Sequence, residues 1–504
     1  MFIDVQNIQP ATGLGLLVAI LVFVKLASVI HTAYFSPLAR VPGPALAKVT
    51  DLWLLWQLYN YRKCPALEDC FRKYGSIVRI GPNKLAVNSE ESMKICYGVG
   101  TKFTKSQWYK SFCFLGWNSV FTLLENREHS ERKRITARLT SKTSVMEHLP
   151  EINEHIKGFL NLMHQRANQV VDIMCVYRYL ALDIVGSTTF GRGFGLMKTG
   201  LSHPFIDDLD AVVMTFPPRG YLSKWVWMVA KRIPNKQWQH HIAGEARLCS
   251  HSDVVINEQM EYARTHGGKL SPEYLKTIVG AYIDHRDANG QPLPRGCITS
   301  DIATVYFAGT DTTSISLSFL TWELARKKDL QKKLYDEVRA HFPDPSQVPA
   351  LADAETWPYL NAIIKEALRL YPAAPSHLER VVPPGGATVE GKWLPEGTVI
   401  GVQAYSIQRK PEVFHEPEQF KPERWFNETD SMKRCLMPFG LGARACPGQH
   451  ISYMEMRLVV AMLVRNFEIG LSPLYDPKDM DVKDFWLLFP AAKKCEVVLK
   501  PRES

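Results

Sequence analysis

One loop near the C-terminus combines a cysteine with groups that could hold its thiolate. The loop, FGLGARACPG at 439–448, leads into a helical pattern at about residues 449 to 466. At a helix N-terminus the free amides and the helix dipole lower the pKa of a thiol. Pro447 starts the helical turn without donating a hydrogen bond, so the amides of Gly448 and Gln449 are free to point at the sulfur. The pattern therefore predicts that Cys446 is a metal ligand.

The other residues of this loop suit a flat, bulky group that carries carboxylates. Phe439 can shield the sulfur from water, and Arg444 is placed to pair with a carboxylate. A buried structural cysteine in a glycine-rich turn is the alternative. Three glycines are expected to take positive φ and let the backbone approach the group closely: Gly440, Gly442 and Gly448.

A second candidate lies in the helix predicted for about residues 299 to 327. Its segment AGTDTT, 308–313, contains glycine, threonine and aspartate, which all disfavour a helix interior. Such a local violation often marks function. Thr312 can donate back to the carbonyl of Ala308, and Gly309 is expected to leave a groove there. Asp311 beside Thr312 supplies the acid and the alcohol that a proton relay requires.

The cysteine loop resembles the haem-binding signature of the cytochrome P450 family. Segment 308–313 is similar to that family's Ala-Gly-x-Asp-Thr-Thr pattern and precedes the loop by about 135 residues, as in the family. The resemblance implies haem b (iron protoporphyrin IX) ligated by Cys446, Arg444 on a propionate, and Asp311 and Thr312 as the catalytic pair. The signature positions that match are Phe439, Gly440, Gly442, Arg444, Cys446 and Gly448.

A possible ion network lies outside these two motifs. Glu366 and Arg369 stand at i and i+3, so their side chains share one helix face. Glu131 and Arg134 have the same spacing, so spacing alone does not select a pair. The first pair precedes Tyr371-Pro372 and resembles the family's Glu-x-x-Arg helix. With the later Pro-Glu-Arg segment, the resemblance implies a buried structural triad of Glu366, Arg369 and Arg424.

Further haem contacts are implied by position in the family. His377 aligns with a residue that commonly meets a propionate, and His129 with Lys133 resembles the helix that offers an aromatic residue and then a base. Arg132 and Arg134 flank Lys133, so which of the three cations reaches the haem stays open, and a solvated basic face is the alternative. His450 is interpreted as structural.

Composition excludes several classes of protein. The chain has 504 residues, 46% hydrophobic and 22% charged, which is enough apolar material for a large core. Its net charge of +9 is spread without a long Lys/Arg block, so we expect no nucleic-acid partner. Its ten cysteines form no CxxC pair, which argues against a disulfide framework or a zinc ribbon.

The N-terminus predicts a membrane anchor. Residues 11–30 form an apolar run with one charge, Lys25, long enough at about 1.5 Å per residue to span roughly 30 Å of hydrocarbon. A cleaved signal and a core helix are the alternatives, but residues 1–10 lack the basic stretch of a signal. Positive charge after the run predicts a cytosolic body. The expected organisation is a lumenal N-terminus at 1–10, an anchor at 11–30, a proline-rich hinge at 31–49 and a catalytic domain at 50–504. Within the hinge, the prolines at 36–44 are expected to stiffen the chain into an extended tether.

The fold is expected to be mainly α with small β-sheets, the cytochrome P450 fold. Apolar residues at three-to-four spacing predict helices at 152–163, 177–186 and 302–325. Alternation around Gly81-Pro82-Asn83 predicts a hairpin at 76–87, and further strands are expected at 388–402 and 494–499. A segment with many prolines and aromatics at 411–426 predicts a packed irregular stretch.

The predicted function is that of a haem-dependent monooxygenase that hydroxylates or epoxidises an apolar small molecule with O2. No flavin or dinucleotide fingerprint is evident, so the resemblance implies a separate NADPH-cytochrome P450 reductase as partner, at the endoplasmic reticulum membrane. Within the family, the sequence is most similar to fungal secondary-metabolism members. The alternatives are a haem-thiolate isomerase or dehydratase that works without reductase, and a haem carrier or sensor. Family position places substrate contacts at 107–121, 207–227, Phe307, 373–376 and 485–489, although residues 225–227 could instead rest on lipid.

Overall fold

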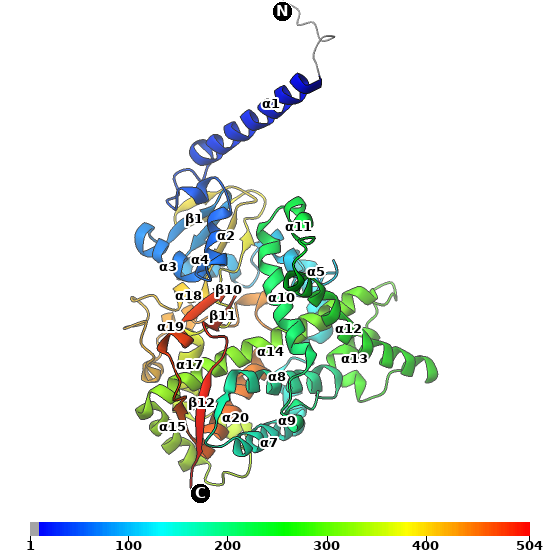
Figure 1. The fold of residues 1–504 in the computed structure, drawn as a ribbon, viewed down its shortest axis with the longest axis vertical. Coiled ribbons are helices and arrows are strands. Elements are labelled where there is room, and N and C mark those ends of the chain that lie inside the picture. Colours follow the sequence, from blue (N-terminus) through cyan, green and yellow to red (C-terminus); the bar gives the residue numbers. More distant parts are fainter. Residues whose placement is uncertain (1–9, 504) are drawn as a thin grey trace, which may run out of the picture.

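The structure, a computed structural model, describes residues 10–503; residues 1–9 of the predicted lumenal segment lie outside this range. The expectation of a mainly helical fold with small sheets is confirmed (Figure 1). The helices that build the core are α7 (Leu149–Gln165), α8 (Ile173–Phe190), α10 (Pro204–Tyr221), α12 (Lys236–Thr265), α14 (Arg295–Arg326), α15 (Lys328–His341), α17 (Pro358–Leu370) and α20 (Gln449–Asn466).

Shorter helices surround this core. They are α2 (Leu52–Tyr59), α3 (Lys63–Tyr74), α4 (Glu90–Tyr97), α5 (Asn126–Ala137), α6 (Lys142–Glu147), α9 (Leu196–Thr199), α11 (Lys224–Ala230), α13 (Ile278–Asp284), α16 (Leu351–Ala354), α18 (Ala404–Ile407) and α19 (Asp430–Cys435).

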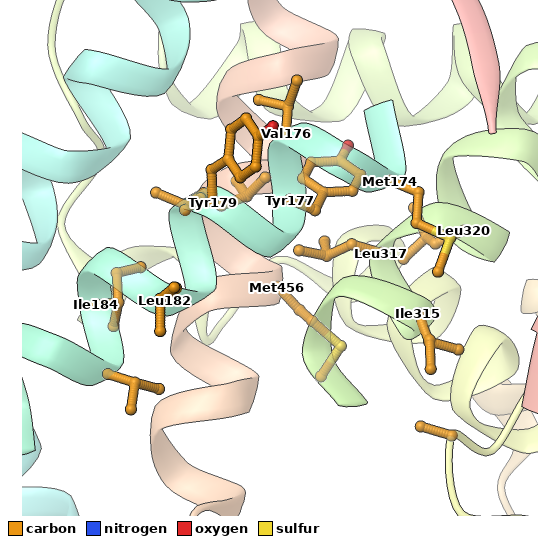
Figure 2. Close-up of a cluster of buried hydrophobic side chains, with 14 of the residues drawn as sticks. Met174, Val176, Tyr177, Tyr179, Leu182, Ile184, Ile315, Leu317, Leu320 and Met456 are labelled. Atoms are coloured by element: carbon orange, nitrogen blue, oxygen red, sulfur yellow. The ribbon is translucent and has the colours of Figure 1, made fainter. Parts of the chain in front are cut away.

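Helix α14 runs through the middle of the body (Figure 1). It packs along α8, and α20 joins the pair, so that apolar side chains from all three helices meet in one buried cluster (Figure 2). Tyr177 of α8 also shares a 2.7 Å hydrogen bond with Thr321 of α14. Because packed interiors are dense, these contacts hold α14 in one position against α20, which begins just after Cys446.

The largest of the sheets within residues 10–503 has five strands and lies at the N-terminal side of the body (Figure 1). Its order is β1-β2-β8-β5-β3, with β2 parallel to β8 and the other pairs antiparallel. The predicted hairpin is confirmed as β1 (Ile77–Gly81) and β2 (Lys84–Val87). The other strands are β3 (Thr104–Lys105), β4 (Val170–Asp172), β5 (Arg380–Val381), β6 (Ala387–Val389), β7 (Lys392–Leu394), β8 (Val399–Val402), β9 (Phe467–Leu471), β10 (Val482–Phe485), β11 (Leu487–Pro490) and β12 (Glu496–Pro501).

The expectation that residues 36–44 form an extended tether is wrong. Residues 31–35 continue the first helix as a π-helical turn, and Leu38 and Val41 are buried against the sheet. The amide of Arg79 in β1 donates to the carbonyl of Pro42 at 2.7 Å, and its guanidinium donates to the carbonyl of Thr32. The prolines shape a folded segment here because apolar neighbours and backbone hydrogen bonds hold it on β1.

Helix α1 (Pro10–Ile30) extends away from the body (Figure 1). Several of its large apolar side chains are exposed, among them Phe23, which is 72% exposed. Within residues 10–503, no helix combines the length and the apolar character needed to cross a membrane.

Candidate functional site

Cys446 lies two residues before Gly448, the N-cap of α20. Its amide donates to the carbonyl of Phe439 at 2.8 Å, which closes the loop 439–446 on itself. All ten cysteines fall within the described residues, and Cys446 is the one whose side chain is exposed. Inert structural cysteines are normally buried, so the accessible sulfur fits the role of a ligand.

The surroundings of the Cys446 thiol oppose and favour the thiolate at once. Desolvation by the surrounding protein atoms raises the pKa of the Cys446 thiol. Two groups act to lower that pKa: the Gly448 amide, which donates to the sulfur, and the positive charge of Lys133. The predicted amide contribution is thus present at Gly448. Lys133 reaches the same loop and donates to the carbonyls of Ala443, at 2.9 Å, and Ala445, at 3.3 Å.

Two of the three loop glycines have the predicted conformation. Gly440 and Gly442 have φ of 66° and 65°, and a Cβ at Gly442 would collide with the carbonyl oxygen of Tyr97 in α4. The expectation for Gly448 is wrong, since its φ is −81° and a Cβ there would make ordinary contacts. Gly442 therefore lets the loop lie directly on α4. Phe439 is half-buried, with its ring 5.1 Å from that of Tyr453.

Arg444 is half-buried and belongs to a group of cations beside the loop. Its guanidinium donates to the carbonyls of Leu123 and Leu124, both at 2.5 Å, and burial and the charge of Arg380 lower the pKa of Arg444 to about 10. His129 on α5 is buried, and burial together with Arg444, Lys105, Lys133 and Arg380 lowers the pKa of its imidazole to about 3. His129 is therefore neutral at physiological pH.

Lys105 and Arg380 are direct register partners across the antiparallel pair of β3 and β5. Like charges opposite each other destabilise a sheet, and desolvation with the charges of Arg380 and Arg444 lowers the pKa of Lys105 well below its usual value. Within residues 10–503, none of Lys105, Arg380 and Arg444 has a carboxylate within 4.0 Å. A buried cation group without protein anions fits a ligand that brings two carboxylates, as haem does with its propionates.

The remaining residues that the resemblance placed near the haem differ in their surroundings. His377 is buried and faces Glu379, with 3.2 Å between Nε2 and Oε1, and its contact with a propionate stays a prediction. Arg132 pairs with the buried Asp301 at 2.5 Å, and Arg134 is exposed. Of the three neighbouring cations on α5, Lys133 is the one at the cysteine loop. His450 is exposed on the first turn of α20.

Helix α14 carries the predicted acid-alcohol pair. The Thr312 hydroxyl donates to the carbonyl of Ala308 at 2.7 Å, the predicted back-bond. Thr313 and Ser452 share a 3.1 Å hydrogen bond that joins α14 to α20 near the cysteine loop. The expectation that Gly309 leaves an open groove is wrong. A Cβ at this position would collide with Val185 of α8, so a side chain of α8 already lies against the glycine. The glycine thus permits close helix packing.

Asp311 is held by an arginine that the sequence analysis missed. Arg178 of α8 donates through Nε to Oδ1 of Asp311 at 2.9 Å and through Nη2 to Asp210 of α10 at 2.7 Å. Burial raises the pKa of the Asp311 carboxyl, whereas the charge of Arg178 acts to lower it. The three residues link α8, α10 and α14, so the orientation of Asp311 depends on all three helices.

Glu366, Arg369 and Arg424 form the implied network. Arg369 donates to both carboxylate oxygens of Glu366, at 2.9 and 2.8 Å, and Arg424 donates at 3.1 Å. Trp425 Nε1 and the amide of Lys421 also donate to Glu366, so this buried carboxylate is fully satisfied.

The network also reaches the cysteine loop. Gln408 donates to the carbonyl of Arg369 at 2.8 Å and accepts from the amide of Met437 at 2.8 Å, just before the loop begins. The triad is therefore coupled to the position of the loop through one side chain.

Aromatic side chains from four of the predicted substrate segments meet beside α14. Phe307 of α14 stacks on Trp486 with centroids 5.7 Å apart, Trp486 contacts Phe112, and Phe112 contacts Phe216 of α10. Trp486 adopts φ of 77° between β10 and β11, a rare conformation for a residue with a side chain. This aromatic cluster is defined here as Phe112, Phe114, Phe121, Phe216, Phe307 and Trp486.

The remaining missed residues carried weak signals. Lys105 and Arg380 lie 275 positions apart, and only their strand pairing brings them together. Their neighbours in the sequence, Thr104 and Glu379, look equally polar. Short strands of two residues give no alternation to read.

Comparison with known proteins agrees with this geometry. The family model described as cytochrome P450 matches residues 47–495. The chain is 29% identical to cytochrome P450 monooxygenase cypX of Dothistroma septosporum, over 97% of this chain and 96% of that protein. It is 30% identical to cytochrome P450 monooxygenase stcB of Emericella nidulans, over 93% and 90% of the two chains, and 26% identical to the averantin hydroxylase of Dothistroma septosporum, over 92% and 87%.

The site and the comparison agree with each other. Cys446 is accessible at a helix N-terminus, the cations beside it lack protein anions within residues 10–503, and the family model matches most of the chain. The chain belongs to the cytochrome P450 family, and it is a monooxygenase with a cysteine-ligated haem iron.

Proposed function

We propose that the protein inserts one atom of O2 into a C–H or C=C bond of a sizeable apolar molecule, as a step of fungal secondary-metabolite biosynthesis. The other oxygen atom leaves as water after uptake of two electrons and two protons. The observation that carries the proposal is the aromatic cluster beside the segment of α14 that bears Asp311 and Thr312. Aromatic walls favour a large apolar substrate.

The residues of this chain have distinct tasks in that reaction. Cys446 is the iron ligand, and Arg444, Lys105, Arg380 and Lys133 hold the haem edge and the cysteine loop. Haem bound through a cysteine thiolate supplies oxygen activation, because the thiolate favours cleavage of the O–O bond.

Thr312 and Asp311 hold and move the protons. The Thr312 hydroxyl donates to Ala308 in this structure and can turn to donate toward the substrate side of α14. Asp311, oriented by Arg178, is the group that can resupply its proton from the region of α8 and α10. This division accounts for an acid placed beside an alcohol on a buried helix.

The electrons come from an NADPH-cytochrome P450 reductase. No dinucleotide fingerprint lies in the sequence, which supports a separate donor protein. The acid-alcohol pair favours monooxygenation over rearrangement or dehydration without reductase, and over haem carriage, since neither of these needs delivered protons.

The same proposal places the protein at the endoplasmic reticulum, with α1 as a single-pass anchor and a cytosolic catalytic domain. Exposed apolar side chains on α1, such as Leu21 and Phe23, support attachment to lipid. On α11, Trp225 is 77% exposed and Val229 is 67% exposed, which suits contact with the same lipid surface. Release of the full chain from microsomes by alkaline carbonate would contradict this anchor.

The test is turnover by the full chain together with a reductase. Product formation from a panel of terpenoids, polyketides, indole alkaloids and averantin is expected to require NADPH, reductase and O2. Reduced protein with carbon monoxide should show the red-shifted absorption of thiolate ligation, and Cys446→Ser should abolish it. Product without reductase would favour the isomerase alternative, and a normal spectrum from Cys446→Ser would refute the ligand assignment.

A further inference from the structure

A cavity that is separate from the cysteine loop and the aromatic cluster lies between α8, the start of α10, α12 and α14. Its volume is about 270 Å³. A cavity of about 150 Å³ lined by apolar groups holds benzene, so this one has room for two fused rings. Its lining residues are Phe190, Arg192, Gly193, Phe194, His203, His251, Val254, Val255 and Tyr306.

Aromatic side chains form much of the wall of this cavity. Tyr306 packs against Phe190 with centroids 4.7 Å apart and against the edge of Phe194 at 5.6 Å. Phe194 in turn meets His203 edge-on at 5.6 Å. Such an arrangement accepts a planar aromatic molecule by stacking and edge contacts.

One end of the cavity has unused donors. Tyr306 is 1% exposed, and its hydroxyl makes no hydrogen bond within residues 10–503. Arg192 lines the same cavity; its side chain is 62% exposed, and of its donors only Nη2 is used within residues 10–503, in a 2.7 Å contact with Glu258. A buried phenol and a guanidinium with free N–H groups match a carboxylate.

We propose that this cavity is an accessory binding site for a planar bicyclic aromatic carboxylate. The rings lie between Phe190, Phe194 and Val254, and the carboxylate accepts hydrogen bonds from Arg192 and the Tyr306 hydroxyl. The site is distinct from the substrate region, because Tyr306 faces α8 and α12 whereas its neighbour Phe307 stacks on Trp486 in the aromatic cluster.

Calorimetric titration of the holoenzyme with 2-naphthoate tests the site, with the substrate region blocked by a phenylimidazole. One binding event is expected. Val254→Trp, at a residue 54% exposed at the cavity, should fill the mouth and weaken binding by about tenfold or more. Val229→Trp is the matched control, because it makes the same exchange on an exposed residue of α11 outside the cavity.

A second variant tests the carboxylate contact. Arg192→Gln should weaken 2-naphthoate and leave the neutral 2-naphthamide unchanged. Absence of binding with the substrate region blocked, or equal affinity in Val254→Trp and Val229→Trp, would overturn the proposal. These readouts do not depend on turnover, so their failure is distinguishable from failure of the monooxygenase proposal.

Discussion

Arg178 and Asp311 form a buried ion pair, with Nε 2.9 Å from Oδ1, that ties the acid of the active-site helix to α8. The same guanidinium bonds to Asp210 on α10, the helix that contributes Phe216 to the aromatic cluster. In the proposed mechanism, proton supply and substrate contact are therefore joined through one arginine.

Replacing Arg178 with Gln should shift the pH dependence of product formation. Burial raises the pKa of Asp311 and Arg178 opposes that rise, so removing the cation raises the pKa further. Because the proposed role of Asp311 is to donate a proton, turnover falls as pH rises through its pKa, and this alkaline limb of the pH profile is expected to move to higher pH, by one unit or more for a lost buried charge, about 1.4 kcal/mol. Arg247→Gln, which breaks the Arg247–Asp208 pair, is the control and should leave the limb in place.

Thr312→Ala should uncouple electron flow from product. In the proposed mechanism the hydroxyl delivers protons, so NADPH consumption should continue while product per NADPH falls, by about tenfold or more for a group in proton transfer. Thr304 makes the same bond, to the carbonyl of Ser300 at 2.7 Å, on the same helix. Thr304→Ala should keep the coupling ratio, and equal ratios in both variants would assign Thr312 to helix structure alone.

Glu366→Gln should destabilise the domain and its haem. The change leaves Arg369 and Arg424 buried without their anion, which costs about 3 to 5 kcal/mol. Thermal unfolding and haem content after purification report the effect. Glu423→Gln removes an exposed partner of Lys333 and should change the free energy of unfolding by less than about 1 kcal/mol; similar losses in both variants would argue against the triad.

Arg380→Leu and His377→Leu distinguish two candidates for a propionate contact. Arg380 faces Lys105 and Arg444, whereas His377 faces Glu379. Haem transfer to apomyoglobin should accelerate in the Arg380 variant and stay near the unaltered rate in the His377 variant. The reverse order would favour His377, the propionate contact that the family resemblance implies.

The parts of the site that lie within one segment could be predicted from the sequence. Helix α20 begins at Gln449, as the pattern after Cys446 indicates, and Thr312 bonds to Ala308 because both lie on one helix. Glu366 and Arg424 required the family resemblance, since 58 residues separate them.

Contacts made by sheet register and helix crossing could not be predicted. Lys105 meets Arg380 because two-residue strands pair in one register, and Gly309 meets Val185 because α8 crosses α14 at that point. The tether expected from the prolines at 36–44 folds onto β1 for a similar reason, since its partners are distant in the chain.

The attachment of Thr32 and Pro42 to Arg79 removes a degree of freedom that a loose connection would have left. Because these bonds join the residues just after α1 to the five-stranded sheet, a surface on which α1 rests would lie close to that side of the catalytic body. The path by which an apolar substrate enters the protein would then depend on how the catalytic body is oriented on that surface, as well as on the shape of the pocket.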